Sequence, residues 1–90
     1  MSYKTRIEQQ LSALGPSVLD VIDESHKHHG HSGWKEGGET HFRVRIVSEA
    51  FRGQTRLARH RLVNELLAAE LKERVHALAI EARAPGENGA

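Results

Sequence analysis

Residues 41–46 alternate strictly between two kinds of side chain, and this feature limits the possible folds more than any other. The alternating residues are His41, Phe42, Arg43, Val44, Arg45 and Ile46. A period of two is typical of a β-strand with one face buried and the other in contact with solvent. The sequence therefore predicts a sheet with one apolar face against a core and one basic, wetter face.

Helical periodicity is present on both sides of this strand in the sequence. Apolar residues recur every three or four positions in residues 3–14, which predicts an amphipathic helix ended by Gly15-Pro16. A long helix is predicted over about 54–67, and residues 68–74 continue as a short second helix. These helices can cover the apolar face of the sheet.

Two further strands complete the prediction. Residues 17–24 are rich in β-branched side chains without strict alternation, which favours a strand with both faces partly covered. Residues 25–38 are rich in glycine and histidine and predict a loop, and residues 75–83 alternate as a last strand. The first two strands should pair antiparallel, whereas the last follows two helices and can pair in parallel.

The predicted order is α-β-β-α-α-β. Three strands with helices on one face make an α+β two-layer sandwich. Ninety residues support one domain, predicted over residues 1–87, followed by a disordered polar tail at 88–90.

The composition excludes several classes of function. The chain has no cysteine, so it has no disulfide framework, no cysteine-based zinc site and no thiol nucleophile. A domain of this size has little room for a deep catalytic cleft, and no catalytic constellation stands out, so we expect a protein that is not an enzyme. With no apolar run long enough to span a membrane and no signal-peptide core, we expect it in the cytoplasm.

Seven histidines are the unusual feature of the composition. Four of them fall within six residues of the loop, at positions 26, 28, 29 and 31, and such a cluster can capture a transition metal. The alternative is a solvated loop whose metal affinity is incidental. A functional site needs a further ligand on a rigid element, and His76 at the start of the last strand is the candidate, unless its imidazole only bonds a neighbouring carbonyl. His41 and His60 are interpreted as structural, and His26 and His29 stay unassigned.

Arginines concentrate in the middle of the chain, where six stand between residues 43 and 61 against a single acid, Glu49. Clustered arginines can contact the phosphates of nucleic acid. The candidate contacts are Arg43, Arg45, Arg56 and Arg59. The alternative is a solvated charged surface, because the overall excess of positive charge is only one.

An ordered set of short motifs resembles the BolA family. The motifs are Glu24-Ser25-His26-Lys27-His28, Glu39-Thr40-His41-Phe42-Arg43-Val44, Ile46-Val47-Ser48, Phe51-x-Gly53, Arg59-His60-Arg61-Leu62-Val63, Leu67, Glu70-Leu71 and Val75-His76-Ala77-Leu78-Ala79-Ile80. The resemblance extends from about residue 3 to Glu87 and implies a fold similar to class II KH domains. The Gly-x-x-Gly signature of KH domains is missing, because the corresponding turn at 52–56 has one glycine.

The resemblance also implies a function and its residues. BolA-like proteins are partners of monothiol glutaredoxins, with which they share a bridging 2Fe–2S cluster in iron sensing and cluster trafficking. The family's cluster ligands map onto His76 and onto a loop histidine, either His28 or His31. Because this chain has no thiolate, a partner cysteine and glutathione would supply the other two ligands, so the chain would hold no cluster alone.

Two functions follow as hypotheses. The first is a non-enzymatic iron–sulfur adaptor of a monothiol glutaredoxin, acting in iron homeostasis or cluster assembly and trafficking. The second is a DNA-binding transcriptional regulator of the BolA morphogene type, acting through its arginine-rich face. In either case we expect the free protein to be a monomer or a weak homodimer that does not associate with membranes.

Overall fold

The structure is a computed structural model that describes residues 2–28 and 38–87, with residues 27 and 28 described by their backbone only. It begins with helix α1 (Tyr3–Leu11), which is capped by the Ser2 hydroxyl oxygen accepting from the Thr5 amide at 3.1 Å. A 3-10 turn over Ser12–Leu14 follows, and Gly15 then adopts a left-handed conformation with φ of 58°. Glycine takes this conformation at little cost, which explains why the helical segment ends there.

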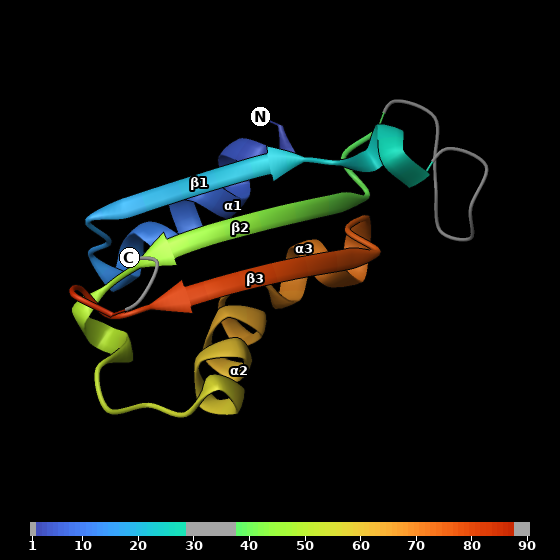
Figure 1. Cartoon of the computed structure of the whole chain (residues 1–90). Coiled ribbons are helices and arrows are strands. Elements are labelled where there is room, and N and C mark those ends of the chain that lie inside the picture. Colours follow the sequence, from blue (N-terminus) through green and yellow to red (C-terminus); the bar gives the residue numbers. More distant parts are fainter. Residues whose placement is uncertain (1, 29–37, 88–90) are drawn as a thin grey trace.

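The three strands form one mixed sheet in the order β1-β2-β3 (Figure 1). Strand β1 (Val18–Asp23) pairs antiparallel with β2 (His41–Val47), and β2 pairs in parallel with β3 (Ala77–Arg83). This is the pairing that the connections predicted. The α+β fold and its α-β-β-α-α-β order are confirmed.

Two helices connect β2 to β3. After a 3-10 turn over Glu49–Phe51, helix α2 (Arg56–Leu66) begins two residues later than predicted, because Thr55 caps it by accepting from the Ala58 amide at 3.1 Å. Helix α3 (Ala68–Glu73) follows directly. The helices lie behind the sheet in Figure 1 and leave its other face open. None of the helices in the described ranges is long and apolar enough to cross a membrane.

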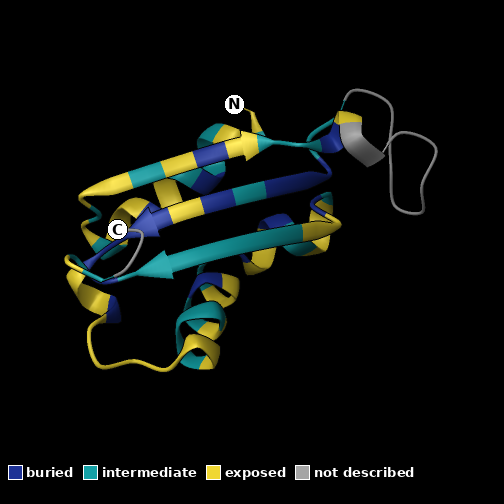
Figure 2. Cartoon of the chain, in the orientation of Figure 1, coloured by how far each residue is buried: buried dark blue, intermediate teal, exposed yellow. Residues whose placement is uncertain are grey.

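The core fills the space between the sheet and the helices. Its large fully buried side chains come from α1, three alternate positions of β2, the turn before α2, α2 itself and the residue that follows α2. Most of β2 is dark blue in Figure 2 because its residues are buried. The largest fully buried apolar side chains are those of Ile7, Leu11, Phe42, Val44, Ile46, Phe51, Val63 and Leu67. The central strand is thus the one whose alternating pattern was clearest in the sequence.

Two predictions about local structure are wrong. Strand β1 is not covered on both faces, because Val18 and Ile22 are 41% and 47% exposed on the open side of the sheet while Val21 is buried. The predicted loop begins instead with a 3-10 helix over Ser25–His28. Aspartate caps this turn, since Asp23 Oδ1 accepts from the Ser25 amide at 2.9 Å. Residues 29–37 of that loop, and the tail at 88–90, lie outside the described residues.

The open face of the sheet is not the basic surface that β2 alone predicted. Arg45 has Asp20 and Glu81 as its register partners on the neighbouring strands, and its Nε lies 3.5 Å from a Glu81 carboxylate oxygen. Arg43 pairs with Glu24 at 3.2 Å. Acids on the flanking segments therefore neutralise both arginines, which a single strand read in isolation cannot show.

Candidate metal centre

His76 lies immediately before β3, at the end of the sheet where β1 runs into the histidine-rich loop. Its imidazole is exposed, but its backbone is fixed, because the His76 amide donates to the Thr40 carbonyl at 2.6 Å. The Ala77 amide donates to the same carbonyl at 3.1 Å. These two bonds join the start of β3 to Thr40, the last residue before β2. His76 is therefore held beside the end of the loop that connects β1 to β2.

The two ends of the loop are joined by a small buried network around Ser25. The Ser25 hydroxyl donates to Asp23 Oδ1 at 2.5 Å, and its oxygen accepts from the amides of Thr40 and His41 at 2.9 and 3.3 Å. Asp23 Oδ2 also accepts from the Glu39 amide at 3.1 Å. One aspartate and one serine therefore fix both the segment that enters the loop and the segment that leaves it.

The charge of Asp23 is favoured by this network. Burial alone would raise the pKa of its carboxyl group, but the hydrogen bonds from Ser25 and the Glu39 amide, together with the charge of His26, outweigh burial and lower the pKa. Asp23 therefore stays ionised at neutral pH, as an acceptor of all these donors must be.

The end of the loop is further fixed by Arg74 and by a glycine. The Arg74 guanidinium donates to the Gly38 carbonyl through Nε at 3.0 Å and Nη2 at 2.7 Å. Gly38 has a φ of 74°, and a Cβ there would lie 3.2 Å from Asp23 Oδ2. Both the left-handed backbone and the close carboxylate explain why glycine stands at this position.

Of the three histidines predicted as ligands, only His76 has a described side chain. His28 ends the 3-10 helix at the first end of the loop, and the placement of its imidazole lies outside the described residues, as does all of His31. The anchored ends of the loop lie next to His76, but the approach of either loop histidine to it stays a prediction.

His41 lies beside His76, which the sequence interpretation missed. Strand alternation predicts a wetter face for His41 although the residue was interpreted as structural; its side chain is 5% exposed, and its ring centroid is 5.4 Å from that of His76 with the planes tilted by 54°. Its Nδ1 lies 2.8 Å from Thr40 Oγ1. The signal that could have located it is the parallel pairing, because His41 is the register partner of Ala77.

The donor set fits a shared cluster better than a complete site. Within the described ranges, no three histidine, cysteine, aspartate or glutamate side chains come together as metal ligands. Two imidazole nitrogens suffice for one iron of a 2Fe–2S cluster when thiolates hold the other iron. With no cysteine in the chain, those thiolates would have to come from another molecule.

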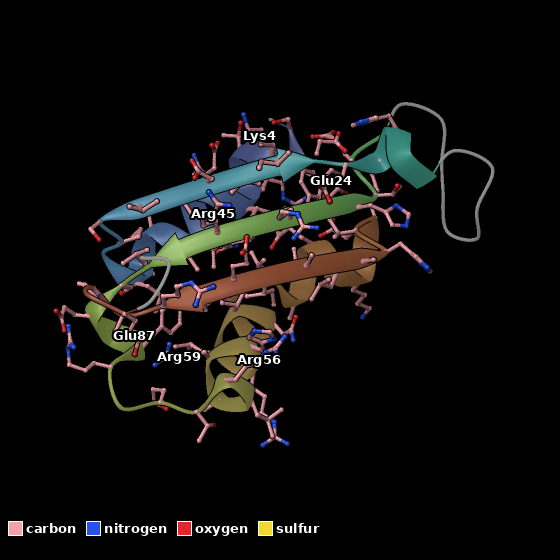
Figure 3. The ribbon with its side chains drawn as sticks, in the orientation of Figure 1. Lys4, Glu24, Arg45, Arg56, Arg59 and Glu87 are labelled. Carbon is pink, nitrogen blue, oxygen red and sulfur yellow. The ribbon has the colours of Figure 1, made fainter. Side chains whose placement is uncertain are left out.

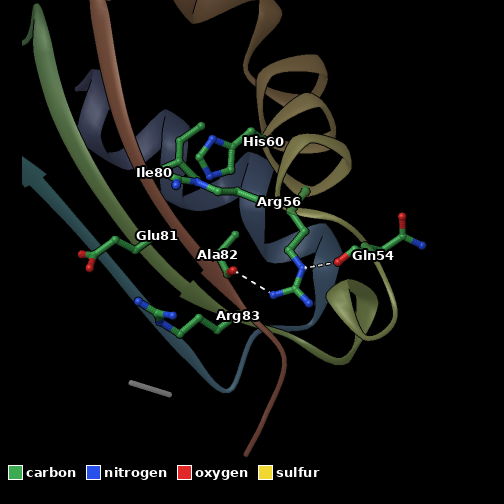
Figure 4. A pocket seen from close by; sticks show the side chains of 8 residues that line it. Gln54, Arg56, His60, Ile80, Glu81, Ala82 and Arg83 are labelled. Atoms are coloured by element: carbon green, nitrogen blue, oxygen red, sulfur yellow. Dashed lines mark hydrogen bonds between the residues drawn. The ribbon is translucent and has the colours of Figure 1, made fainter. Parts of the chain in front are cut away.

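The four arginines predicted to contact nucleic acid fall in two places. Arg43 and Arg45 lie on the open face of the sheet among acids, as described above. Arg59 on α2 is held by Glu87 (Figure 3), with contacts of 2.6 and 2.8 Å that keep the pKa of Glu87 at about 2. Its guanidinium also donates to the Ala82 and Gln54 carbonyls, as the dashed lines in Figure 4 show. Arg59 would have to leave Glu87 to bind a phosphate.

A groove of about 460 Å³ separates the first half of α2 from the outer edge of β3 (Figure 4). Its lining residues are Gln54, Arg56, Arg59, His60, Ile80, Glu81, Ala82 and Arg83. The lining is rich in positive charge, with Glu81 its only acid. His60 is half-buried there, and burial, followed by the charge of Arg56, lowers the pKa of its imidazole.

Comparison with known proteins gives consistent matches. A family described as BolA-like protein matches residues 11–87. A protein of Sinorhizobium sp., named as an uncharacterized protein in the cobS 5' region, is 54% identical over 97% of this chain and 96% of its own length. The DNA-binding transcriptional regulator BolA of Escherichia coli is 43% identical over 89% of this chain and 73% of its own length.

Solved structures of other proteins also match the fold of this chain. BolA1 from Arabidopsis thaliana superposes with a TM-score of 0.85 at 38% identity, covering 97% of this chain and 96% of that one. Several relatives are longer, and the chain spans 59% of BolA-like protein 1 from Pongo abelii and 24% of SufE-like protein 1 from Arabidopsis thaliana. The matches in sequence and in fold extend over nearly the whole chain, and the protein therefore belongs to the BolA-like family.

Proposed function

We propose that this protein is a non-enzymatic iron–sulfur adaptor that binds a monothiol glutaredoxin in the cytoplasm and supplies histidine ligands to a bridging 2Fe–2S cluster. In this role it would serve iron homeostasis or the assembly and trafficking of clusters. The observation that carries the proposal is the position of His76, an exposed imidazole on a fixed backbone beside the anchored ends of a histidine-rich loop.

The residues at this end of the sheet would have separate roles in the proposed function. His76 would bind one iron, and His28 or His31 would bind the same iron from the loop. Asp23, Ser25 and Thr40 hold the described ends of the loop against the start of β3, so that a ligand from the loop would start from a fixed position beside His76. The partner's cysteine and glutathione would hold the second iron, and the cluster would supply a redox-active centre whose redox and release behaviour differs from that of one with four thiolates.

The partner requirement follows from the same donor set. Two imidazoles leave half of the ligand positions of a 2Fe–2S cluster empty, and the chain has no thiolate to fill them. The free protein is therefore expected to hold no cluster. It acquires one only together with a molecule that brings thiolates, which is the chemistry of a monothiol glutaredoxin with glutathione.

Mixing the protein with a cluster-loaded monothiol glutaredoxin should change the visible circular dichroism, because imidazole replaces thiolate on one iron. His76→Ala should abolish that change. His60→Ala is the matched control, since it removes a half-buried imidazole in the α2–β3 groove and should leave the change intact. A spectrum that does not respond to the wild-type protein, or a response that persists in His76→Ala, would contradict the proposal.

DNA binding is the second candidate, favoured by the cationic α2–β3 groove and by the name of the Escherichia coli relative. Phosphates would contact Arg56 and Arg83 in the groove, because no ion pair within the described ranges holds either one, whereas Arg43, Arg45 and Arg59 are paired with acids. Of the four arginines predicted from the sequence, Arg56 alone remains as a phosphate contact, and Arg83 is added.

If the groove binds duplex DNA, Arg56→Ala and Arg83→Ala should each weaken binding and reduce the salt slope of the affinity by about one. Arg45→Ala removes an equal charge from a position between two acids and should change the affinity little. Fluorescence anisotropy with labelled duplex across a salt series measures both quantities. Equal losses in all three variants would indicate attraction by overall charge, and no binding at low salt would eliminate this function.

A further inference from the structure

The Glu87 carboxylate is bound by Arg59, a residue of the α2–β3 groove, in the way that an external anion would be. Arg59 Nη1 donates to Glu87 Oε1 at 2.6 Å, and Nη2 donates to Oε2 at 2.8 Å, which is a bidentate contact. The Ala84 amide donates to the same Oε1 at 2.8 Å. The Arg59 side chain is only 12% exposed and that of Glu87 is 35% exposed. The structure therefore contains a formed oxyanion site, and the chain's own carboxylate occupies it.

The position of the Arg59 guanidinium does not depend on Glu87 alone. Its Nε donates to the Gln54 carbonyl at 3.0 Å, and its Nη1 also donates to the Ala82 carbonyl at 3.1 Å. Both carbonyls belong to residues that line the groove (Figure 4). If Glu87 left, these two bonds would still hold the guanidinium in place, with the edge formed by Nη1 and Nη2 available to another oxyanion. An anion site that is already oriented costs less ordering when its ligand binds.

A short turn brings the Glu87 carboxylate to this site. The Glu87 amide donates to the Ala84 carbonyl at 3.2 Å, and Pro85 and Gly86 are the two residues between them. Gly86 has a φ of 85°, and proline followed by glycine at these positions is typical of a type II turn. A Cβ on Gly86 would meet nothing within 4 Å, so only the left-handed backbone favours glycine. Alanine at this position should weaken the turn without changing any charge.

We propose that the α2–β3 groove is a site for closely spaced phosphate groups and that the Glu87–Arg59 ion pair is an autoinhibitory contact on it. While the pair is formed, Arg56 and Arg83 are the cations of the groove that a ligand can use. When the pair is broken, Arg59 joins them. A polyanion binds this open form better and so shifts the population towards it. The proposal rests on the groove of the second candidate function and does not depend on the iron–sulfur cluster.

Inorganic tripolyphosphate is the first probe, because it carries several phosphate charges without bases or sugars. Titration of ¹⁵N-labelled protein, followed at the Arg59 Nε–Hε cross peak, reports binding at the site itself. Glu87→Gln should bind tripolyphosphate about tenfold more tightly than the wild-type protein, the gain expected when the open form rises from about a tenth of the molecules to all of them. Glu65→Gln is the matched control, since it makes the same change of charge on the exposed surface of α2 and should give a much smaller gain.

Two further variants separate release of the ion pair from the change in net charge. Gly86→Ala should tighten tripolyphosphate binding by about threefold, because strain in the left-handed turn favours the open form with the charge unaltered. Gly15→Ala introduces comparable strain at a φ of 58° with nothing within 4 Å of its Cβ, and it should leave the affinity unchanged. Adding Arg59→Ala to Glu87→Gln should abolish the gain.

The proposal would be overturned if Glu87→Gln bound tripolyphosphate no better than Glu65→Gln. A gain that persists without Arg59, or equal affinities for Gly86→Ala and Gly15→Ala, would also overturn it. Labelled duplex DNA is the second probe for the same variants. A parallel gain with both probes would support the proposal with DNA as a ligand of the groove. A gain with tripolyphosphate in a protein that binds no duplex would support the phosphate site and eliminate the DNA-binding function.

Discussion

Ser25→Ala is expected to lower the free energy of unfolding by about 2–4 kcal/mol, a large effect for the loss of one oxygen atom. Ser25 is 2% exposed, and its hydroxyl oxygen accepts from the amides of Thr40 and His41. Its removal leaves these buried donors unsatisfied, and each such group costs about 1–3 kcal/mol. It also removes a donor to Asp23, which loses one of the bonds that offset the burial of its charge.

The same substitution should impair the proposed site, because Ser25 joins the loop to the strand that is bonded to His76. Urea denaturation gives the stability, and visible circular dichroism of the glutaredoxin mixture gives the functional loss under conditions where the variant is folded. Ser12→Ala is the matched control, since its hydroxyl donates only to the Glu8 carbonyl on an exposed turn. A Ser25→Ala protein as stable as Ser12→Ala would show that the network does not anchor the loop.

Arg6→Met is expected to be at least as damaging, because it leaves a buried carboxylate without its countercharge. Glu70 on α3 is 1% exposed, and Arg6 Nη2 lies 2.8 Å from its Oε2. This is the distance of an ion pair. Within the described ranges, neither carboxylate oxygen of Glu70 accepts a hydrogen bond of good geometry, so the positive charge of Arg6 is the main compensation for the buried negative charge. A buried charge such as that of Glu70 costs about 3–5 kcal/mol when its partner is removed.

A double variant separates charge from packing at this contact. Arg6→Met combined with Glu70→Met should recover much of the stability, because an apolar pair can replace a buried ion pair with little loss. Glu73→Gln is the control, since Glu73 is the exposed second partner of Arg6, and its loss should cost little. Thermal unfolding of the four proteins gives the result. An Arg6→Met protein close to wild type in stability would show that Arg6 does not compensate the buried carboxylate of Glu70.

Most of the fold could be predicted from local patterns. The alternation around Phe42 and the helical spacing of α1 and α2 arise because one face of each element is buried. The spacing of apolar residues within each segment is enough to show which face that is. The end of the first helical segment could also be predicted, since it ends at Gly15 as expected. The start of α2 was off by two residues because Thr55 was not recognised as its cap.

The electrostatic character of the sheet could not be predicted, because it depends on pairing between distant segments. Arg45 looked basic in sequence, but its neighbours in the sheet are Asp20 and Glu81, which lie 25 and 36 positions away. Arg59 is likewise neutralised by Glu87. Charges read along one strand overestimate a basic surface wherever the flanking strands carry acids.

The candidate site was predictable only in part, for a similar reason. His76 was identified from its position at the start of a strand. His41 was interpreted as structural, and its contacts agree, but its burial was not predicted, because alternation placed it on the wetter face while Thr40 and Ser25 at the loop end bond to it. Strand alternation reports which side a residue faces, but it does not report what lies over the end of a sheet.

The proposed adaptor function requires this chain to supply imidazole nitrogens to a cluster shared with a glutaredoxin. The direct measurement is pulsed electron paramagnetic resonance of the reduced complex, prepared with this chain alone labelled with ¹⁵N-histidine. Two ¹⁵N imidazole couplings are expected in the wild-type complex and one or none in His76→Ala. His28→Asn and His31→Asn should identify the second ligand, because only one of them should lose a coupling. A reduced cluster without any ¹⁵N coupling would contradict the account.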